Sequence, residues 1–249
     1  SNAASIGFYD TKQRCFCEDK IRLAEMDPAI LPDTANEMEA VGSYQGIPVT
    51  VALGDNQASF LGAAGKEENT ALVNVGTGGQ ISILSGQYFA ENGIEVRPFL
   101  GGKYLLAGSS LCGGKAYALL ETFFSSIVKT ATGEKISLYK AMEQLARSGK
   151  EQDLKTPEDR KLKIKTTFDG TRMDPGSSGS IILLNTENFT PEAFTYGVLK
   201  GMCTELYEMY QTIQVGTGIQ VKKLIGSGNG VRKNPVFCEI VEEMFQNKL

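Results

Sequence analysis

Apolar side chains recur at helical spacing in two segments near the end of the chain. They predict a helix over 191–213, with a proline in its first turn, and a closing helix after the glycines at 226–230. The apolar face of the first helix consists of Leu199, Met202, Leu206, Tyr210 and Ile213. That of the second consists of Phe237, Ile240, Val241 and Met244, at i, i+3, i+4 and i+7.

Shorter apolar runs bounded by glycine predict strands. The run 48–53 is rich in valine, lies between two glycines and is expected to be a buried strand. Asp55 then stands at the junction with a predicted helix over 58–64. The other predicted strands are 71–75, 80–84, 104–107, 181–184 and 221–225. Strands alternating with helices place the chain in the mixed α/β class.

The positions of glycine residues and of charged residues indicate how these elements are connected. The turn 76–79 joins two strands into a hairpin. A helix is expected to begin at 108–110, with Ser109 or Ser110 as its N-cap, and to continue to Phe124. The charged segment 150–165 has no clear apolar period and is expected to be a solvated excursion.

Composition excludes several classes of function. The formal net charge is −4 with no basic cluster, so nucleic-acid binding is not expected. No apolar run reaches the ~20 residues of a membrane span, and no secretory signal is visible. The five cysteines fit no zinc or disulfide spacing, which favours free thiols and a cytoplasmic location. The chain has no histidine, so catalysis by a histidine base or a histidine-ligated metal is excluded.

Three glycine-rich turns each follow an apolar run, at 76–79, 108–114 and 226–230. Glycine lets backbone N–H groups approach a phosphate closely, and a helix start behind the turn adds partial positive charge. The last turn does not match the dinucleotide-binding pattern, because Gly230 comes one residue early, and no P-loop motif is present.

Asp55 is the candidate catalytic residue. A carboxylate at a strand-to-helix junction is equally compatible with a helix N-cap and with a general base. In phosphoryl transfer a weak base is sufficient, because it orients the attacking hydroxyl and accepts the proton late.

The segment Gly54-Asp55-Asn56-Gln57-Ala58 resembles the start of the second domain in FGGY-family carbohydrate kinases, in which the matching aspartate is the base on the sugar hydroxyl. Three further segments resemble family motifs in the same order. They are a phosphate loop at Gly76, Thr77 and Gly78, a nucleotide-adjacent glycine at Gly108, and an adenosine motif with Gly228, Asn229, Gly230 and Asn234. The opening of the adenosine motif is most similar to the sedoheptulokinase branch, and residues 168–172 are similar to another family loop.

The resemblance implies an actin-like, ribonuclease-H-like ATPase domain with a mixed sheet flanked by helices. It also implies ATP and Mg²⁺ as cofactors and a small sugar as substrate, with metal ligands that the motifs do not identify. Residues 1–3 are interpreted as an expression-tag remnant, 4–47 as a lead-in from a first domain outside this chain, and 48–249 as the second domain, whose last strand and helix are expected to lie beyond Leu249.

The resulting hypothesis is the nucleotide-side part of a ketose kinase that is inactive without its other domain. The substrate could be sedoheptulose, but xylulose, gluconate and glycerol remain open. Two alternatives are a non-catalytic nucleotide-binding module of the actin-like superfamily and a dinucleotide-dependent oxidoreductase.

Overall fold

The computed structural model describes residues 2–35 and 39–249. Residue 1 of the predicted tag remnant and residues 36–38 of the predicted lead-in lie outside the described residues. Among the described residues, no helix is both long enough and apolar enough to cross a membrane.

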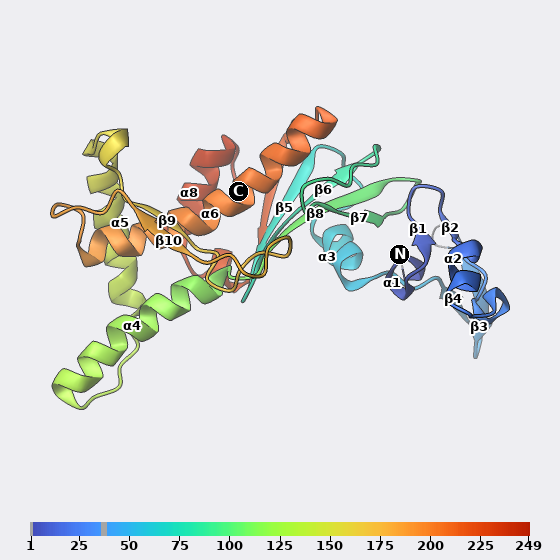
Figure 1. Cartoon of the computed structure of the whole chain (residues 1–249), viewed down its shortest axis with the longest axis horizontal. Helices are drawn as coiled ribbons and strands as arrows, with labels where there is room; N and C mark the ends of the chain where they lie inside the picture. Colours follow the sequence, from blue (N-terminus) through green and yellow to red (C-terminus); the bar gives the residue numbers. More distant parts are fainter. Residues whose placement is uncertain (1, 36–38) are drawn as a thin grey trace.

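A five-stranded sheet forms the centre of the molecule (Figure 1). Its strands, in spatial order, are β11 (Lys223–Ser227), β5 (Thr70–Val75), β6 (Gly79–Ser85), β8 (Tyr104–Ser110) and β7 (Glu95–Pro98). β11 pairs with β5 in parallel, and every other pair is antiparallel, which confirms a mixed α/β fold. Because β5, β8 and β11 therefore run in the same direction, their carboxyl ends meet at one edge of the sheet.

The predicted hairpin is confirmed, since β5 and β6 pair antiparallel up to Val75 opposite Gly79. The prediction that a helix begins at Gly108–Ser110 is wrong. Those residues continue β8, because Ser110 still pairs with Gly79 across the ladder. The helix α4 (Gly114–Thr132) begins only after Gly113, and no side chain caps it.

Helices cover one face of the sheet much more fully than the other. α4, α5 (Tyr139–Lys155), α6 (Pro191–Thr217), α7 (Asn229–Arg232) and α8 (Pro235–Phe245) share one core with alternate strand residues such as Ala71 and Val73. α3 (Asp55–Ala64) packs on the opposite face through Phe60, which meets Leu72. The apolar face predicted for α6 is confirmed, since all five of its residues are buried.

The segment 150–165 is mostly exposed, as predicted, but it consists largely of regular elements rather than an excursion. α5 continues to Lys155, and it is followed by the 3₁₀ turn η2 (Glu158–Arg160) and by β9 (Lys163–Lys165), which pairs with β10 (Ser180–Ile182). The buried face of α5 is formed by Met142, Ala146 and Gly149. Its apolar period therefore begins before residue 150, outside the charged segment that was predicted to be a solvated excursion.

The amino-terminal part forms small, separate elements at the end of the molecule away from α4 and α5 (Figure 1). They are α1 (Ala3–Ile6), β1 (Tyr9–Asp10), β2 (Cys15–Phe16), α2 (Glu18–Leu23), η1 (Pro28–Ile30), β3 (Ala40–Tyr44) and β4 (Ile47–Thr50). The prediction of a buried strand over 48–53 is wrong, because β4 is exposed and pairs only with β3. This hairpin crosses the predicted boundary between residues 47 and 48, and the boundary itself stays a prediction.

Candidate functional site

Three glycine turns meet at the edge of the sheet where β5, β8 and β11 end. The first follows β5 at 76–78, the second follows β8 at 111–113, and the third follows β11 at 228–230. Ligands of open α/β sheets bind outside the carboxyl ends of the strands, where such turns leave a crevice. The fold therefore brings together segments that are 150 residues apart in the chain.

The first and second turns are in direct backbone contact. A Cβ on Gly113 would overlap the backbone of Gly78 and Gly79, and one on Gly114 would overlap the carbonyl oxygen of Gly76. The N–H of Gly114 donates to the Gly76 oxygen at 3.0 Å, and the N–H of Lys115 donates to the Thr77 oxygen at 3.0 Å. The start of α4 is thus held against the turn after β5.

The third turn packs against the end of β5. Gly228 has φ of +83°, a conformation that favours glycine, and a Cβ there would overlap the Val75 carbonyl oxygen. A Cβ on Gly230 would lie 2.5 Å from a methyl group of Val75. All three turns therefore enclose the same strand end, and glycine is required where their backbones approach.

A cavity of about 670 Å³ opens beside these turns, within the size range of small-molecule sites. Five of the predicted nucleotide-binding residues line it, namely Gly76, Thr77, Asn229, Gly230 and Asn234. Gly78 and Gly228 belong to the turns but not to the lining. Gly108 lies within β8, where a Cβ would overlap Met209 of α6, so it permits close packing of that helix and does not line the cavity.

Other lining residues come from α4 and α5 and were not among the predicted site residues. They include Gly114, Lys115, Tyr117, Tyr139 and Glu143, with Lys233 after α7. The glycine pair 113–114 at the start of α4 was a sequence signal for Gly114 and Lys115, since it lies within the turn noted at 108–114. Tyr139 and Glu143 had no such signal, because α5 reaches the cavity only through tertiary packing.

Two tyrosines give one side of the cavity an aromatic lining. The rings of Tyr117 and Tyr139 lie 5.9 Å apart at 34°. Burial, and then the nearby carboxylate of Glu143, raise the pKa of Tyr117 to about 12, while a hydrogen bond with Asn234 opposes this shift. Asn234 also accepts a hydrogen bond from the Phe237 N–H at 3.0 Å and so caps α8. Flat aromatic groups beside a glycine turn suit the stacking of a heterocyclic base.

Asp55 is the first residue of α3, and Gly54 occupies the N-cap position. The Oδ1 atom of Asp55 accepts a hydrogen bond from the N–H of Asn56 at 2.7 Å, and Asp55 is exposed. The start of α3 is fixed by buried Gln57, whose amide donates to the Pro98 carbonyl oxygen at 3.3 Å. Asp55 does not line the cavity, and its helix packs on the opposite face of the sheet.

A partly buried carboxyl group contacts the end of β8, directly before the second turn. Glu205 of α6 accepts a hydrogen bond from the hydroxyl of Ser110 at 2.8 Å. Burial raises the pKa of Glu205. Within residues 2–35 and 39–249, no three Asp, Glu, Cys or His side chains are grouped so as to hold a metal ion. A divalent cation held mainly by ligand phosphates would fit this arrangement, because Mg²⁺ commonly takes only one or two protein carboxylates.

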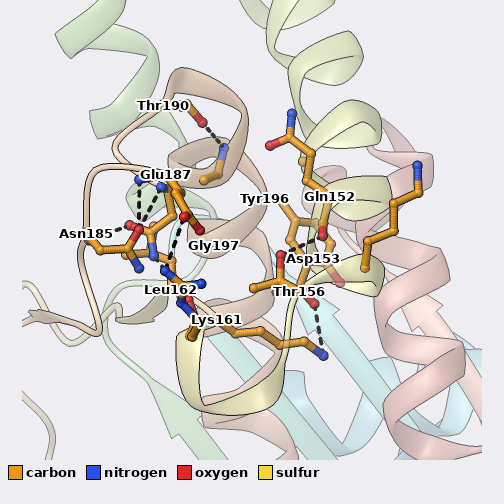
Figure 2. A pocket seen from close by; sticks show the side chains of 15 residues that line it. Gln152, Asp153, Thr156, Lys161, Leu162, Asn185, Glu187, Thr190, Tyr196 and Gly197 are labelled. Carbon is orange, nitrogen blue, oxygen red and sulfur yellow. Dashed lines mark hydrogen bonds and ion pairs between the residues drawn. The ribbon is translucent and has the colours of Figure 1, made fainter.

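A second cavity of about 360 Å³ lies between α5, α6 and the residues before α6 (Figure 2). Several of its charged groups form ion pairs: Asp153 lies 2.9 Å from Lys200, which is outside the lining, and 3.7 Å from Lys161, and Arg160 lies 3.2 Å from Glu187. Asn185 and Asn188 bond within their own loop, and the Asn188 amide also donates to the Arg160 oxygen of η2 at 3.2 Å. We therefore interpret this cavity as a polar junction that joins the loop to the helices.

Comparison with known proteins gives consistent matches to kinases. No protein-family model matches the chain. The chain is 25% identical to sedoheptulokinase from Mus musculus over 264 aligned positions, covering 98% of this chain and 53% of that protein. It is 24% identical to glycerol kinase from Streptococcus uberis, covering 94% of this chain and 47% of that protein. The chain thus spans about half the length of the curated relatives it matches.

Solved structures show the same fold. Xylulose kinase from Rhodospirillum rubrum superposes with a TM-score of 0.80 at 19% identity, covering 96% of this chain and 48% of that one. Plasmodium falciparum glycerol kinase with ADP superposes with a TM-score of 0.70 at 19% identity, covering 94% of this chain and 47% of that one. These likenesses confirm the expected actin-like α/β fold.

Proposed function

Because this chain is a relative of the FGGY carbohydrate kinases, we propose that it forms the nucleotide side of an ATP-dependent sugar kinase. The observation that carries the proposal is the meeting of three glycine turns at the carboxyl edge of the sheet, beside a cavity that is lined by the first turn, the third turn and the start of α4. Five residues predicted to bind nucleotide line that cavity. The match to a glycerol kinase solved with ADP supports the same ligand class.

The cavity suits each part of ATP. We assign the base to the side lined by Tyr117 and Tyr139, and the phosphates to the turn at Gly76 and Thr77. Bound Mg²⁺ would neutralise phosphate charge. We propose that this ion arrives with the nucleotide, since the described residues offer no carboxylate cluster of their own.

We assign the role of general base to Asp55. Its carboxylate is exposed at the start of α3 and forms no ion pair with any residue of the described ranges. It would accept the hydroxyl proton as the sugar oxygen attacks the γ-phosphorus, while the bond from that phosphorus to the bridging oxygen breaks and ADP leaves. The sugar would lie between this chain and a further domain.

We propose a ketose as the substrate, with sedoheptulose as the first candidate because of the adenosine-motif resemblance. Identities of 25% to a sedoheptulokinase and 24% to a glycerol kinase do not separate these substrates. A cytoplasmic setting is supported by the five cysteines, all in described residues and all free thiols.

The test is sugar-dependent ADP release by the full-length protein with sedoheptulose, xylulose, gluconate and glycerol. Asp55→Asn should lower kcat by about 10²- to 10⁴-fold and leave ATP affinity unchanged, because the amide still accepts the Asn56 N–H but cannot take the proton. Asp159→Asn, at an exposed position in η2, is the matched control and should leave kcat unchanged.

Unchanged turnover in Asp55→Asn would remove Asp55 from its assigned role. ATP binding without phosphorylation of any of these sugars would instead favour the non-catalytic nucleotide-binding module.

A further inference from the structure

Lys115 is the charged residue of the cavity that lies nearest in sequence to the glycine turns. It is the second residue of α4 and lines the cavity together with Gly76 and Thr77. Its backbone N–H donates to the Thr77 oxygen at 3.0 Å, which fixes its Cα beside the first turn. The side chain of Lys115 thus starts from the part of the cavity assigned to phosphates.

The ammonium group of Lys115 is bound to a residue outside the cavity. Its Nζ donates to both carboxylate oxygens of Asp169, at 2.9 and 2.8 Å. This contact raises the pKa of Lys115, so the group stays charged. Asp169 belongs to the segment between β9 and β10, and does not line the cavity.

The segment that carries Asp169 is anchored independently of Lys115. Arg172 forms an ion pair with Glu95 of β7, and Gly170 packs so closely on Pro175 that a Cβ would overlap its backbone. The hydroxyl of buried Thr167 donates to the Ser178 oxygen at 3.1 Å. Asp169 can therefore remain in place when its partner leaves.

The pair between Lys115 and Asp169 is weak enough to be exchanged. The two side chains are 42% and 38% exposed, and ion pairs between exposed side chains contribute little to stability. A polyphosphate offers several negative oxygens at one place, and charge-assisted bonds to phosphate are stronger than bonds to a solvated carboxylate. The other charged lining residues are Glu143, which pairs with Arg147, and Lys233.

We propose that Lys115 binds the nucleotide phosphates and that Asp169 holds it in the ligand-free protein, so that Asp169 and phosphate compete for one ammonium group. This inference rests on the proposed nucleotide site and adds to it a residue pair with opposite effects on affinity. Lys115 favours binding, whereas Asp169 opposes it.

Calorimetric titration of the full-length protein with ATP, ADP, AMP and adenosine tests the proposal. Lys115→Met keeps the apolar part of the side chain and removes the charge. It should weaken ATP binding by about tenfold, which corresponds to the loss of roughly one charge-assisted contact, and it should leave adenosine binding unchanged. Asp169→Asn should tighten ATP binding severalfold. Lys129→Met, at an exposed position in the last turn of the same helix, should bind ATP like the wild type.

The sign of the Asp169→Asn effect separates competition from a structural role. If the pair only stabilised the fold, both substitutions would weaken binding or leave it unchanged, and either result would overturn the inference. Equal ATP affinity of the wild type and Lys115→Met would overturn it while leaving the proposed function intact. Absence of ATP binding by the wild type would overturn both, and circular dichroism of each variant confirms that it is folded.

Discussion

Gly113 shows how tightly single residues are constrained at the edge of the sheet. Its φ of −72° lies outside the left-handed region, and packing gives a direct reason for glycine here. A methyl group would meet backbone atoms of Gly78 and Gly79. Backbone atoms cannot move aside as the end of a long side chain can, so the whole turn would have to shift.

Gly113→Ala should therefore lower the free energy of unfolding by about 1–3 kcal/mol, the usual cost of overpacking, and should also weaken ATP binding. Gly62→Ala is the matched control. Gly62 lies inside α3 with no atom within 4 Å of a new Cβ, so alanine there should stabilise the protein by about 0.4–1 kcal/mol. Urea unfolding measures both changes. A Gly113→Ala protein as stable as the wild type would contradict the proposed clash.

Residues of the site could be predicted where their signal is local. A glycine turn after an apolar run is visible in the sequence, and four of the five predicted residues that line the cavity lie in such turns, whereas Asn234 was predicted from the motif resemblance. Gly108 carried the same signal, but its glycine is explained by the approach of Met209 from α6. Tyr139 and Glu143 could not be found from sequence, because their place in the site depends on how α5 packs.

At the scale of elements, α6 was the most predictable because its apolar residues recur at helical spacing from Leu199 to Ile213. Its five predicted core positions are buried against the sheet and α8. β4 was mispredicted as a buried strand, since an apolar run between glycines does not show whether another layer covers it. α5 was missed because its core positions are small or unbranched, Met142, Ala146 and Gly149, and charged residues surround them.

Leu206 links α6 to the first glycine turn. It is 2% exposed, and a Cβ on Gly79 would lie 3.3 Å from its Cδ2 atom. Leu206→Ala should cost about 2–5 kcal/mol of stability through the lost contacts and the cavity left behind. Val215→Ala, on the same helix but 87% exposed, should change stability by less than about 0.5 kcal/mol. Thermal and urea unfolding compare the two, and equal losses would contradict the assignment of Leu206 to the core.

At the scale of the whole molecule, the chain supplies one side of the proposed active site. It spans about half of its curated relatives. The cavity lies on the face covered by α4, α5 and α6, whereas Asp55 begins the helix on the other face. The exposed hairpin of β3 and β4 carries Val41, Tyr44, Ile47 and Val49 on its surface.

The 249-residue chain alone should therefore show no sugar-dependent ADP release, whereas the full-length protein should, because the sugar would contact both domains. A coupled assay for ADP, with each of the four sugars at equal protein concentration, measures this. Turnover by the chain alone comparable to that of the full-length protein would show that one side of the site is sufficient.

The close packing of the three turns around the end of β5 also limits where this chain can change in length. An inserted residue in a turn would drive its backbone into other backbone atoms, since a Cβ on Gly113 would overlap Gly78 and one on Gly228 would overlap the Val75 carbonyl oxygen. The connection 133–137, by contrast, is exposed at the far end of α4, which projects from the body of the molecule (Figure 1). Insertions and deletions should therefore be tolerated in this exposed connection, whereas the turns at the edge of the sheet should keep their length.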